Sequence, residues 1–223
     1  MIFKYCIAFA LSCMPLALCA DLSKTEQSLE KQGLVDIQSL DKTIKVSLMY
    51  ARPDNFTGKI LYKDLQHAYL HPKAAQALVK AQKILKKIHP KYSLIVFDAT
   101  RPMSIQQVMW DVVKDTPKYF YVSNPARGGG LHNYGLAVDI SICDEKGDTI
   151  TMGTKVDYMG SASHITNEAQ LVAGGRMSKT ALRNRELLRK VMKEAGFRPL
   201  STEWWHFNLV SRATAKKYYK VIK

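Results

Sequence analysis

Two short clusters in this sequence place histidine close to a carboxylate. His132 and Asp139 have six residues between them, and a glycine-rich loop at 127–130 leads into the histidine. Glu203 and His206 form the second cluster, with two tryptophans between them. Taken separately, each cluster favours ordinary hydrogen-bonded or exposed side chains, and the tryptophans are as compatible with anchors of a core as with walls of a pocket.

Taken together, the four side chains form a chemically complete hydrolytic set. Catalytic zinc takes three protein ligands from histidine and Asp/Glu and keeps one position for water. His132, Asp139 and His206 can supply those three ligands for one Zn²⁺ per chain. Glu203 can then act as a general base that takes a proton from the water.

The spacing of Glu203 and His206 sets a condition on this hypothesis. In a regular strand, residues three apart point to opposite faces of the sheet. The two side chains can share a site only if Glu203 precedes the regular pleat or a bulge separates it from His206.

Arg101 is a further candidate catalytic residue. It follows an apolar run at 94–97 and precedes Pro102. An arginine at a strand end can point into a site and stabilise an oxyanion. The alternative is an ion pair with Asp98, and the sequence leaves both open.

Helical and strand-like periodicities indicate the elements that position these residues. Helices are expected over 73–89, from 104 onward and over about 180–195, and strands over 94–97, 135–143 and 203–210. Strands and helices do not alternate regularly, so we expect an α+β fold with helices packed against a mostly antiparallel sheet that carries the zinc site. Because no repeat or low-complexity linker interrupts 21–223, we expect a single domain there.

Two of these elements carry more detailed expectations. In 135–143 the residues alternate, which places Asp139 on a face of small and polar side chains. Ser104 and Gln107 form a capping-box pattern that predicts the start of the second helix. The inward face of that helix is expected to hold Ile105, Val108, Met109, Val112 and Val113.

The first 20 residues have the pattern of a secretory signal peptide. Lys4 precedes an apolar run that is too short to span a membrane comfortably and gives way to polar residues after Ala20. We therefore expect an exported, periplasmic protein with no transmembrane span in the mature chain. A lipid anchor at Cys19 is the alternative. Cleavage after Ala20 leaves Cys143 as a lone cysteine, which we expect to pack as a small hydrophobe.

The formal net charge of +14 raises the question of nucleic-acid binding. The lysines, however, are scattered along helical faces, and no aromatic-basic module accompanies them. We therefore expect a solvated basic surface and no nucleic-acid partner; weak attraction to anionic envelope polymers is compatible with this charge.

Five ordered blocks between Val46 and Leu209 resemble the D-alanyl-D-alanine dipeptidases of the VanX type, within the zinc peptidases that also include D-Ala-D-Ala carboxypeptidases. The blocks are DNFTGK at 54–59, FDATRP at 97–102, HNYGLAVD at 132–139, MGTKVDYM at 152–159 and EWWHF at 203–207. The resemblance implies Zn²⁺ on the three ligands named above, Glu203 as the general base and Arg101 as the stabiliser of the transition state. It also implies that Tyr50 and Asp157 bind the free ammonium of a small D,D-dipeptide substrate.

The chain departs from this family at two places. The family carries a serine two residues before the first metal histidine, where this chain has Gly130, and the segment 160–175 is longer than its counterpart. Two alternatives stay open: a related zinc D,D-carboxypeptidase or broader dipeptidase acting on peptidoglycan fragments, and a non-catalytic, zinc-stabilised binding module of the cell envelope.

Overall fold

The computed structural model describes residues 22–223. The expected signal peptide at 1–20, with the alternative lipid anchor at Cys19, lies outside the described residues. Among residues 22–223, no helix combines the length and apolar character needed to cross a membrane.

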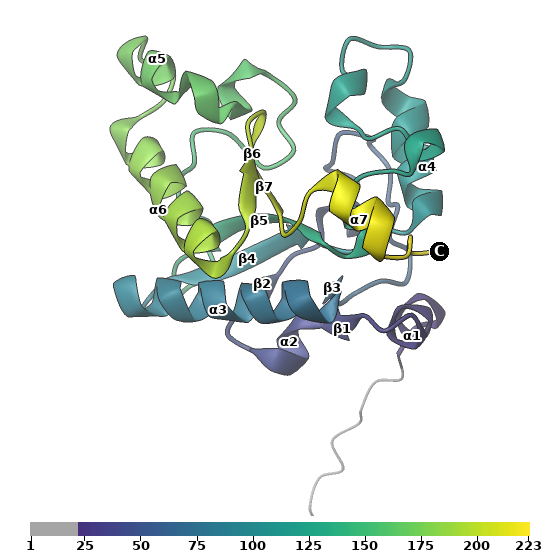
Figure 1. Ribbon diagram of the computed structural model, residues 1–223. Helices are drawn as coiled ribbons and strands as arrows, with labels where there is room; N and C mark the ends of the chain where they lie inside the picture. The colour runs from purple at the N-terminus through teal and green to yellow at the C-terminus, as the bar shows by residue number, and fades with distance from the viewer. Residues whose placement is uncertain (1–21) are drawn as a thin grey trace, which may run out of the picture.

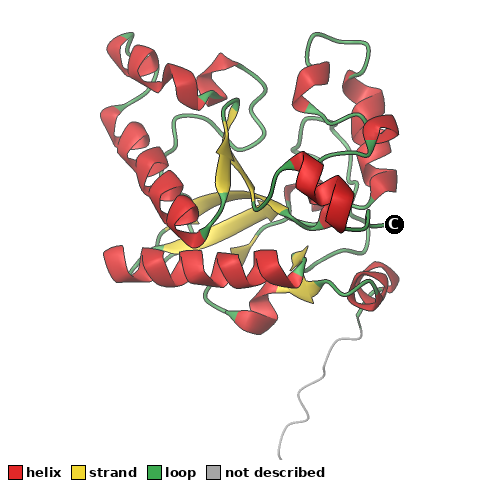
Figure 2. Ribbon diagram, in the orientation of Figure 1, coloured by secondary structure: helices red, strands yellow, loops and turns green. Residues whose placement is uncertain are grey.

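Helices surround a central sheet (Figures 1 and 2). The α-helices are α1 (Lys24–Lys31), α2 (Ile37–Leu40), α3 (Pro72–Ile88), α4 (Met103–Val113), α5 (Glu168–Ala173), α6 (Lys179–Ala195) and α7 (Arg212–Tyr218). The strands are β1 (Val35–Asp36), β2 (Lys45–Val46), β3 (Tyr69–Leu70), β4 (Ser93–Asp98), β5 (Ala137–Cys143), β6 (Arg198–Leu200) and β7 (Glu203–Asn208).

The main sheet has the strand order β2-β4-β5-β7-β6. Only the β2–β4 pair is parallel within it; β4–β5, β5–β7 and β6–β7 are antiparallel. Strands β1 and β3 form a separate antiparallel pair. The predicted α+β fold with a mostly antiparallel sheet is therefore confirmed.

The long helices α3 and α6 close the core beside the sheet, and Figure 1 shows α3 running along its lower side. Leu78 and Leu85 of α3 are fully buried with Leu188 of α6 and Val96 of β4. Local signals set the ends of both helices. Pro72 occupies the first turn of α3, and Gly196 ends α6 with a left-handed φ of 109°.

The start of α4 differs from the prediction. The helix begins at Met103 with Pro102 as its N-cap and no side-chain capping bond, so the expected capping box of Ser104 and Gln107 does not form. Val108 and Val112 are exposed, at 38% and 37%, so their predicted place on the inward face is wrong, whereas Gln106 is buried. The helix turns a polar side chain inward because Gln106 has hydrogen-bond partners inside the protein, described below.

Strand β5 is buried along its whole length, on both faces. A fully buried aspartate requires compensating partners, because an unpaired charge away from water is strongly unfavourable. Asp139 therefore depends on the groups that face it from neighbouring elements. Cys143 ends the strand as a buried free thiol, as predicted.

Candidate active site

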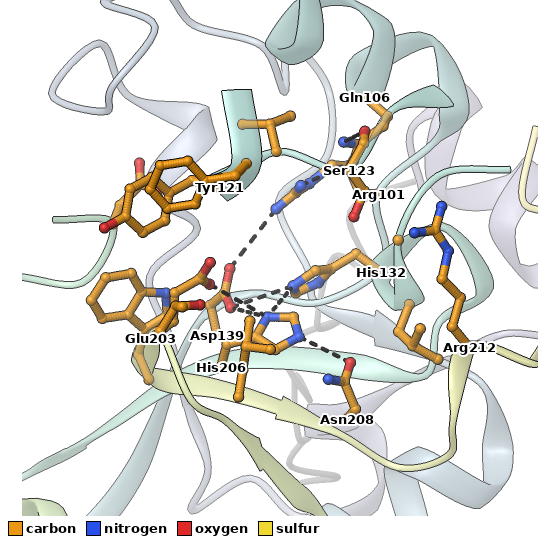
Figure 3. Close-up of a pocket in the computed structure, with 18 of the residues that line it drawn as sticks. Arg101, Gln106, Tyr121, Ser123, His132, Asp139, Glu203, His206, Asn208 and Arg212 are labelled. Atoms are coloured by element: carbon orange, nitrogen blue, oxygen red, sulfur yellow. Dashed lines mark hydrogen bonds and ion pairs between the residues drawn. The ribbon is translucent and has the colours of Figure 1, made fainter. Parts of the chain in front are cut away.

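All seven residues singled out from the sequence line one pocket with a volume of about 430 Å³, a size suited to a small ligand. They are Tyr50, Arg101, His132, Asp139, Asp157, Glu203 and His206. Figure 3 shows the three expected metal ligands converging at its floor.

Strand register brings the carboxylate and one histidine together. Asp139 of β5 lies opposite His206 of β7 and, on its other side, opposite Asp98 of β4. His132 comes from a short 3-10 helix, Leu131–Tyr134, that enters β5 through Gly135. Gly135 has a φ of +64°, and a Cβ there would lie 2.8 Å from the backbone nitrogen of His71, so this turn requires glycine.

The three candidate ligand atoms form a compact triangle. His206 Nδ1 lies 2.9 Å from Asp139 Oδ1, His132 Nε2 lies 3.3 Å from the same oxygen, and the two imidazole nitrogens are 3.2 Å apart. Tetrahedral zinc with bonds of about 2.0–2.1 Å separates its ligand atoms by about 3.3–3.4 Å. The triangle is therefore close to the size that a single Zn²⁺ requires.

Hydrogen bonds on the far side of each imidazole orient its lone pair. His132 Nδ1 donates to the carbonyl oxygen of Ala99 at 2.6 Å, and His206 Nε2 donates to Asn208 Oδ1 at 2.9 Å. Each ring then turns a bare nitrogen toward the other, and two acceptors 3.2 Å apart need a proton or a cation between them. Such outer partners are typical of metal-binding histidines. The residues present therefore fit a divalent metal.

Charge inside the triangle supports the same interpretation. Burial acts to raise the pKa of Asp139, but His132 and His206 outweigh burial and hold this pKa well below its ordinary range. Burial acts to lower the pKa of His132, and the carboxylate of Asp139 outweighs it and raises this pKa. A carboxylate held ionised among imidazoles is the state in which it ligates a metal.

A bulge resolves the spacing of Glu203 and His206. In the pairing of β6 with β7, Glu203 lies opposite Leu200, whereas the adjacent Pro199 lies opposite Phe207. The extra residues of β7 turn Glu203 to the same side as the metal triangle, and its Oε2 lies 3.9 Å from His206 Nδ1. Burial raises the pKa of Glu203 to about 7, with His206 opposing the shift.

Arg101 forms the ion pair with Asp98 that the sequence left open, and it also lines the pocket. Its Nη2 donates to Asp98 at 2.5 Å, and it also lies 3.8 Å from Asp139 Oδ2. Gln106 accepts a hydrogen bond from Nη1 at 3.0 Å, and the guanidinium carbon lies 5.2 Å from the centroid of the Tyr50 ring. Burial opposes the charge, but Asp98 and the other acidic partners outweigh it and raise the pKa of Arg101. The ion pair fixes a permanent cation beside the triangle.

Asp157 and Tyr50 meet at another part of the pocket wall. The Tyr50 hydroxyl donates to Asp157 Oδ1 at 3.2 Å, and the backbone N–H of Phe56 donates to Oδ2 at 3.4 Å. Burial, reinforced by Asp139, raises the pKa of Asp157 to about 7. Asp157 also has a φ of 68°, a left-handed conformation that is rare outside glycine and concentrates at functional sites.

Several pocket groups were missed from the sequence. The carbonyl of Ala99 gave no signal, because every residue has one. Asn208 follows His206 by two residues, so strand periodicity could have placed both on one face. Gln106, Tyr121 and Ser123 reach the pocket from α4 and the loop after it, and only the tertiary structure brings them there.

Comparisons with known proteins identify the family of this chain. A family model described as D-ala-D-ala dipeptidase, of the M15 peptidases, matches residues 30–223. A D-alanyl-D-alanine dipeptidase of Escherichia coli (strain K12) is 33% identical over 181 residues, which cover 81% of this chain and 86% of the relative. One from Enterococcus faecalis is 26% identical over 85% of this chain and 97% of the relative.

A solved LD-carboxypeptidase, LdcB, has a more distant similarity, with a TM-score of 0.41 and 22% identity over 67% of this chain and 63% of its own length. The family model and the Escherichia coli relative both extend over most of the chain. This chain is therefore a peptidase that belongs to the D-ala-D-ala dipeptidase family.

Proposed function

We propose that this protein is a zinc-dependent dipeptidase that hydrolyses D-alanyl-D-alanine to two molecules of D-alanine. The observation that carries the proposal is the triangle of His132, Asp139 and His206, with two bare imidazole nitrogens 3.2 Å apart and a buried carboxylate beside them. Glu203 and Arg101 add the two groups that hydrolysis needs and that metal storage does not.

The chemistry divides among the residues of the pocket. A Zn²⁺ held by the triangle supplies Lewis-acid polarisation of the substrate carbonyl and lowers the pKa of water. Glu203 accepts the proton of the attacking water and returns it to the departing amine, a role suited to a group whose pKa lies near neutrality. The guanidinium of Arg101 stabilises the negative charge that develops on the carbonyl oxygen.

The preference for a dipeptide rests on Asp157 and Tyr50. An anionic carboxylate buried in the pocket wall favours a substrate with a free ammonium group next to the scissile bond. A longer or blocked chain cannot supply that charge there, and it leaves the carboxylate unpaired, which lowers its affinity.

The Glu203→Gln variant tests the catalytic assignment. Glutamine has the same shape but cannot take the proton, so we expect zinc content equal to the wild type and hydrolysis of D-Ala-D-Ala lowered by about 10² or more. Zinc is measured by metal analysis of the purified protein, and D-alanine release by a coupled assay. Unchanged hydrolysis contradicts the assignment and favours a zinc-stabilised binding module.

A comparison of free and blocked substrates tests the substrate assignment. We expect turnover of free D-Ala-D-Ala and little turnover of its N-acetyl derivative or of a pentapeptide ending in D-Ala-D-Ala. Equal rates on the blocked substrates favour a D,D-carboxypeptidase of the same zinc class.

We also propose that the enzyme is exported to the periplasm, on the signal-peptide pattern of residues 1–20. Deleting these residues should abolish export, which fractionation of the cells measures.

A further inference from the structure

Ser123 carries a hydroxyl group that the proposed mechanism does not use. It lies in the loop between two 3-10 helices, Tyr119–Tyr121 and Pro125–Arg127, and lines the pocket near Arg101 (Figure 3). The side-chain oxygen forms no hydrogen bond with any group of residues 22–223. A pocket hydroxyl without a protein partner is free to bind a ligand.

The neighbouring glycine gives this hydroxyl its space. A Cβ on Gly130 would lie 2.8 Å from Ser123 Oγ and 3.2 Å from its Cβ. The backbone of Gly130 is extended, with φ −107°, so a side chain is excluded there by contact with Ser123 and not by conformation. Ser123 thus occupies the part of the pocket that a side chain at position 130 would fill.

Gln106 holds Ser123 in place relative to Arg101. Its Nε2 donates to the carbonyl oxygen of Ser123 at 2.7 Å, while its Oε1 accepts from Arg101 Nη1 at 3.0 Å. Gln106 is only 1% exposed, so this connection is shielded from water. The position of the Ser123 loop is therefore tied to the group that faces the scissile carbonyl in the proposed function.

Charge is distributed unevenly around the pocket. Asp157 makes one part of the wall acidic, with the neutral Tyr50 hydroxyl donating to it, whereas Arg101, Arg198 and Arg212 contribute cations to the lining, Arg212 from the first turn of α7. Arg212 donates to the carbonyl oxygen of Arg127 at 3.1 Å, in the loop that continues to Gly130. In Figure 3, Ser123 and Arg212 lie on the side of the pocket away from Tyr121 and Glu203.

We propose that Ser123 determines specificity by donating a hydrogen bond from its hydroxyl to the terminal carboxylate of the dipeptide, on the side of the pocket where Arg101 and Arg212 lie (Figure 3). A zwitterionic substrate would then have its ammonium on Asp157 and its carboxylate on Ser123, with the scissile bond between them. This inference rests on the proposed dipeptidase function and adds the group that recognises the carboxyl end.

Ser123→Ala, assayed on two substrates, tests the assignment. For D-Ala-D-Ala we expect KM to rise about tenfold with kcat little changed, since a hydrogen bond to a charged group is lost from both bound states. For D-alanyl-D-alaninamide, which has no carboxylate, we expect the variant to match the wild type. Thr202→Ala removes a different hydroxyl from the pocket wall and should leave the acid-to-amide ratio of the two substrates unchanged.

Equal effects of Ser123→Ala on the acid and the amide, or no effect on either, overturn the inference. A transfer of the hydroxyl provides a second test. Gly130→Ser alone should lower kcat/KM because the new Cβ at position 130 collides with Ser123. The double variant Ser123→Gly, Gly130→Ser removes this collision and should recover most of the wild-type kcat/KM. A double variant no better than Ser123→Gly alone also overturns the inference. Wild-type turnover of D-Ala-D-Ala, measured first, decides the proposed function separately.

Discussion

At the level of single residues, a backbone carbonyl and a side-chain amide fix the tautomers of His132 and His206. Ala99 and Asn208 each accept a proton from the outer nitrogen of one ring, which leaves the inner nitrogens of His132 and His206 bare. These partners therefore decide which nitrogen of each ring is available to a metal.

Asp157 allows a prediction at the same scale. Its carboxyl faces Tyr50, Arg101 and Asp139, and burial raises its pKa to about 7. Asp157→Asn removes the partner of the substrate ammonium, so we expect kcat/KM for D-Ala-D-Ala to fall about 10- to 100-fold at pH 8. The Asp157 carboxyl is charged only above its raised pKa. The ratio of the wild-type kcat/KM to the variant kcat/KM should therefore shrink as the pH is lowered from 8 to 6.

Steady-state kinetics of both proteins between these pH values check the prediction. Asp54→Asn is a matched control because its side chain is 69% exposed, and it should leave kcat/KM unchanged. A wild-type to variant ratio of kcat/KM that stays constant with pH would contradict an interaction between the ionised Asp157 carboxylate and the substrate.

Among the secondary-structure elements, helix α6 anchors the segment 152–162, which contributes Asp157 and Met159 to the pocket wall. Arg185 donates to the carbonyl oxygens of Met152 at 2.7 Å and Ala162 at 3.0 Å, and it pairs with Glu168 at 3.4 Å. Its guanidinium also lies 5.4 Å from the centroid of the Trp204 ring. Arg185 thus attaches the segments around Met152 and Ala162 to α6 and to Trp204 of β7.

Arg185→Met should destabilise the protein strongly. The arginine is 1% exposed, and its loss leaves buried carbonyls without donors and Glu168 with only Arg189 as a charged partner. We expect the free energy of unfolding to fall by about 3 kcal/mol, measured by urea denaturation. Arg183→Met changes an exposed arginine of the same helix and should cost less than about 0.5 kcal/mol; similar losses in both variants would contradict the anchoring role.

At the scale of the whole molecule, a metal bound by His132, Asp139 and His206 would connect β5, β7 and the loop before β5, which are distant in the chain. A ligand that binds only the folded state at 100 times its Kd adds about 2.7 kcal/mol of stability. For a chain of this length that corresponds to a rise in Tm of about 5–10 °C. We expect zinc to raise the Tm of chelator-treated protein by this amount.

Calorimetry of the chelator-treated protein with and without zinc measures the shift. His206→Ala removes a ligand and should abolish most of the zinc-dependent rise, whereas His89→Ala, at an exposed position, should retain it. A rise of equal size in both variants would place the stabilising metal elsewhere.

Local sequence alone predicted the long helices α3 and α6 and the buried strand β4, and it singled out Arg101, His132, Asp139, Glu203 and His206. Tyr50 and Asp157 were added by the resemblance to the dipeptidase family. Proline, glycine and apolar periodicity act within a few residues, so they can be recognised without knowing the fold. The capping box at Ser104 failed because a tertiary requirement, the burial of Gln106 between Arg101 and the Ser123 loop, governs how α4 is placed.

The way the seven residues meet depends on contacts between segments far apart in the chain. The bulge in β7 that turns Glu203 toward His206 depends on pairing with β6, and the ion pair of Arg101 depends on the register of β4 with β5. The contact between Ser123 and Gly130 joins a loop to the turn before β5. Pairing register and loop packing are interactions between segments distant in the chain, so their geometry does not follow from the residue types of either segment.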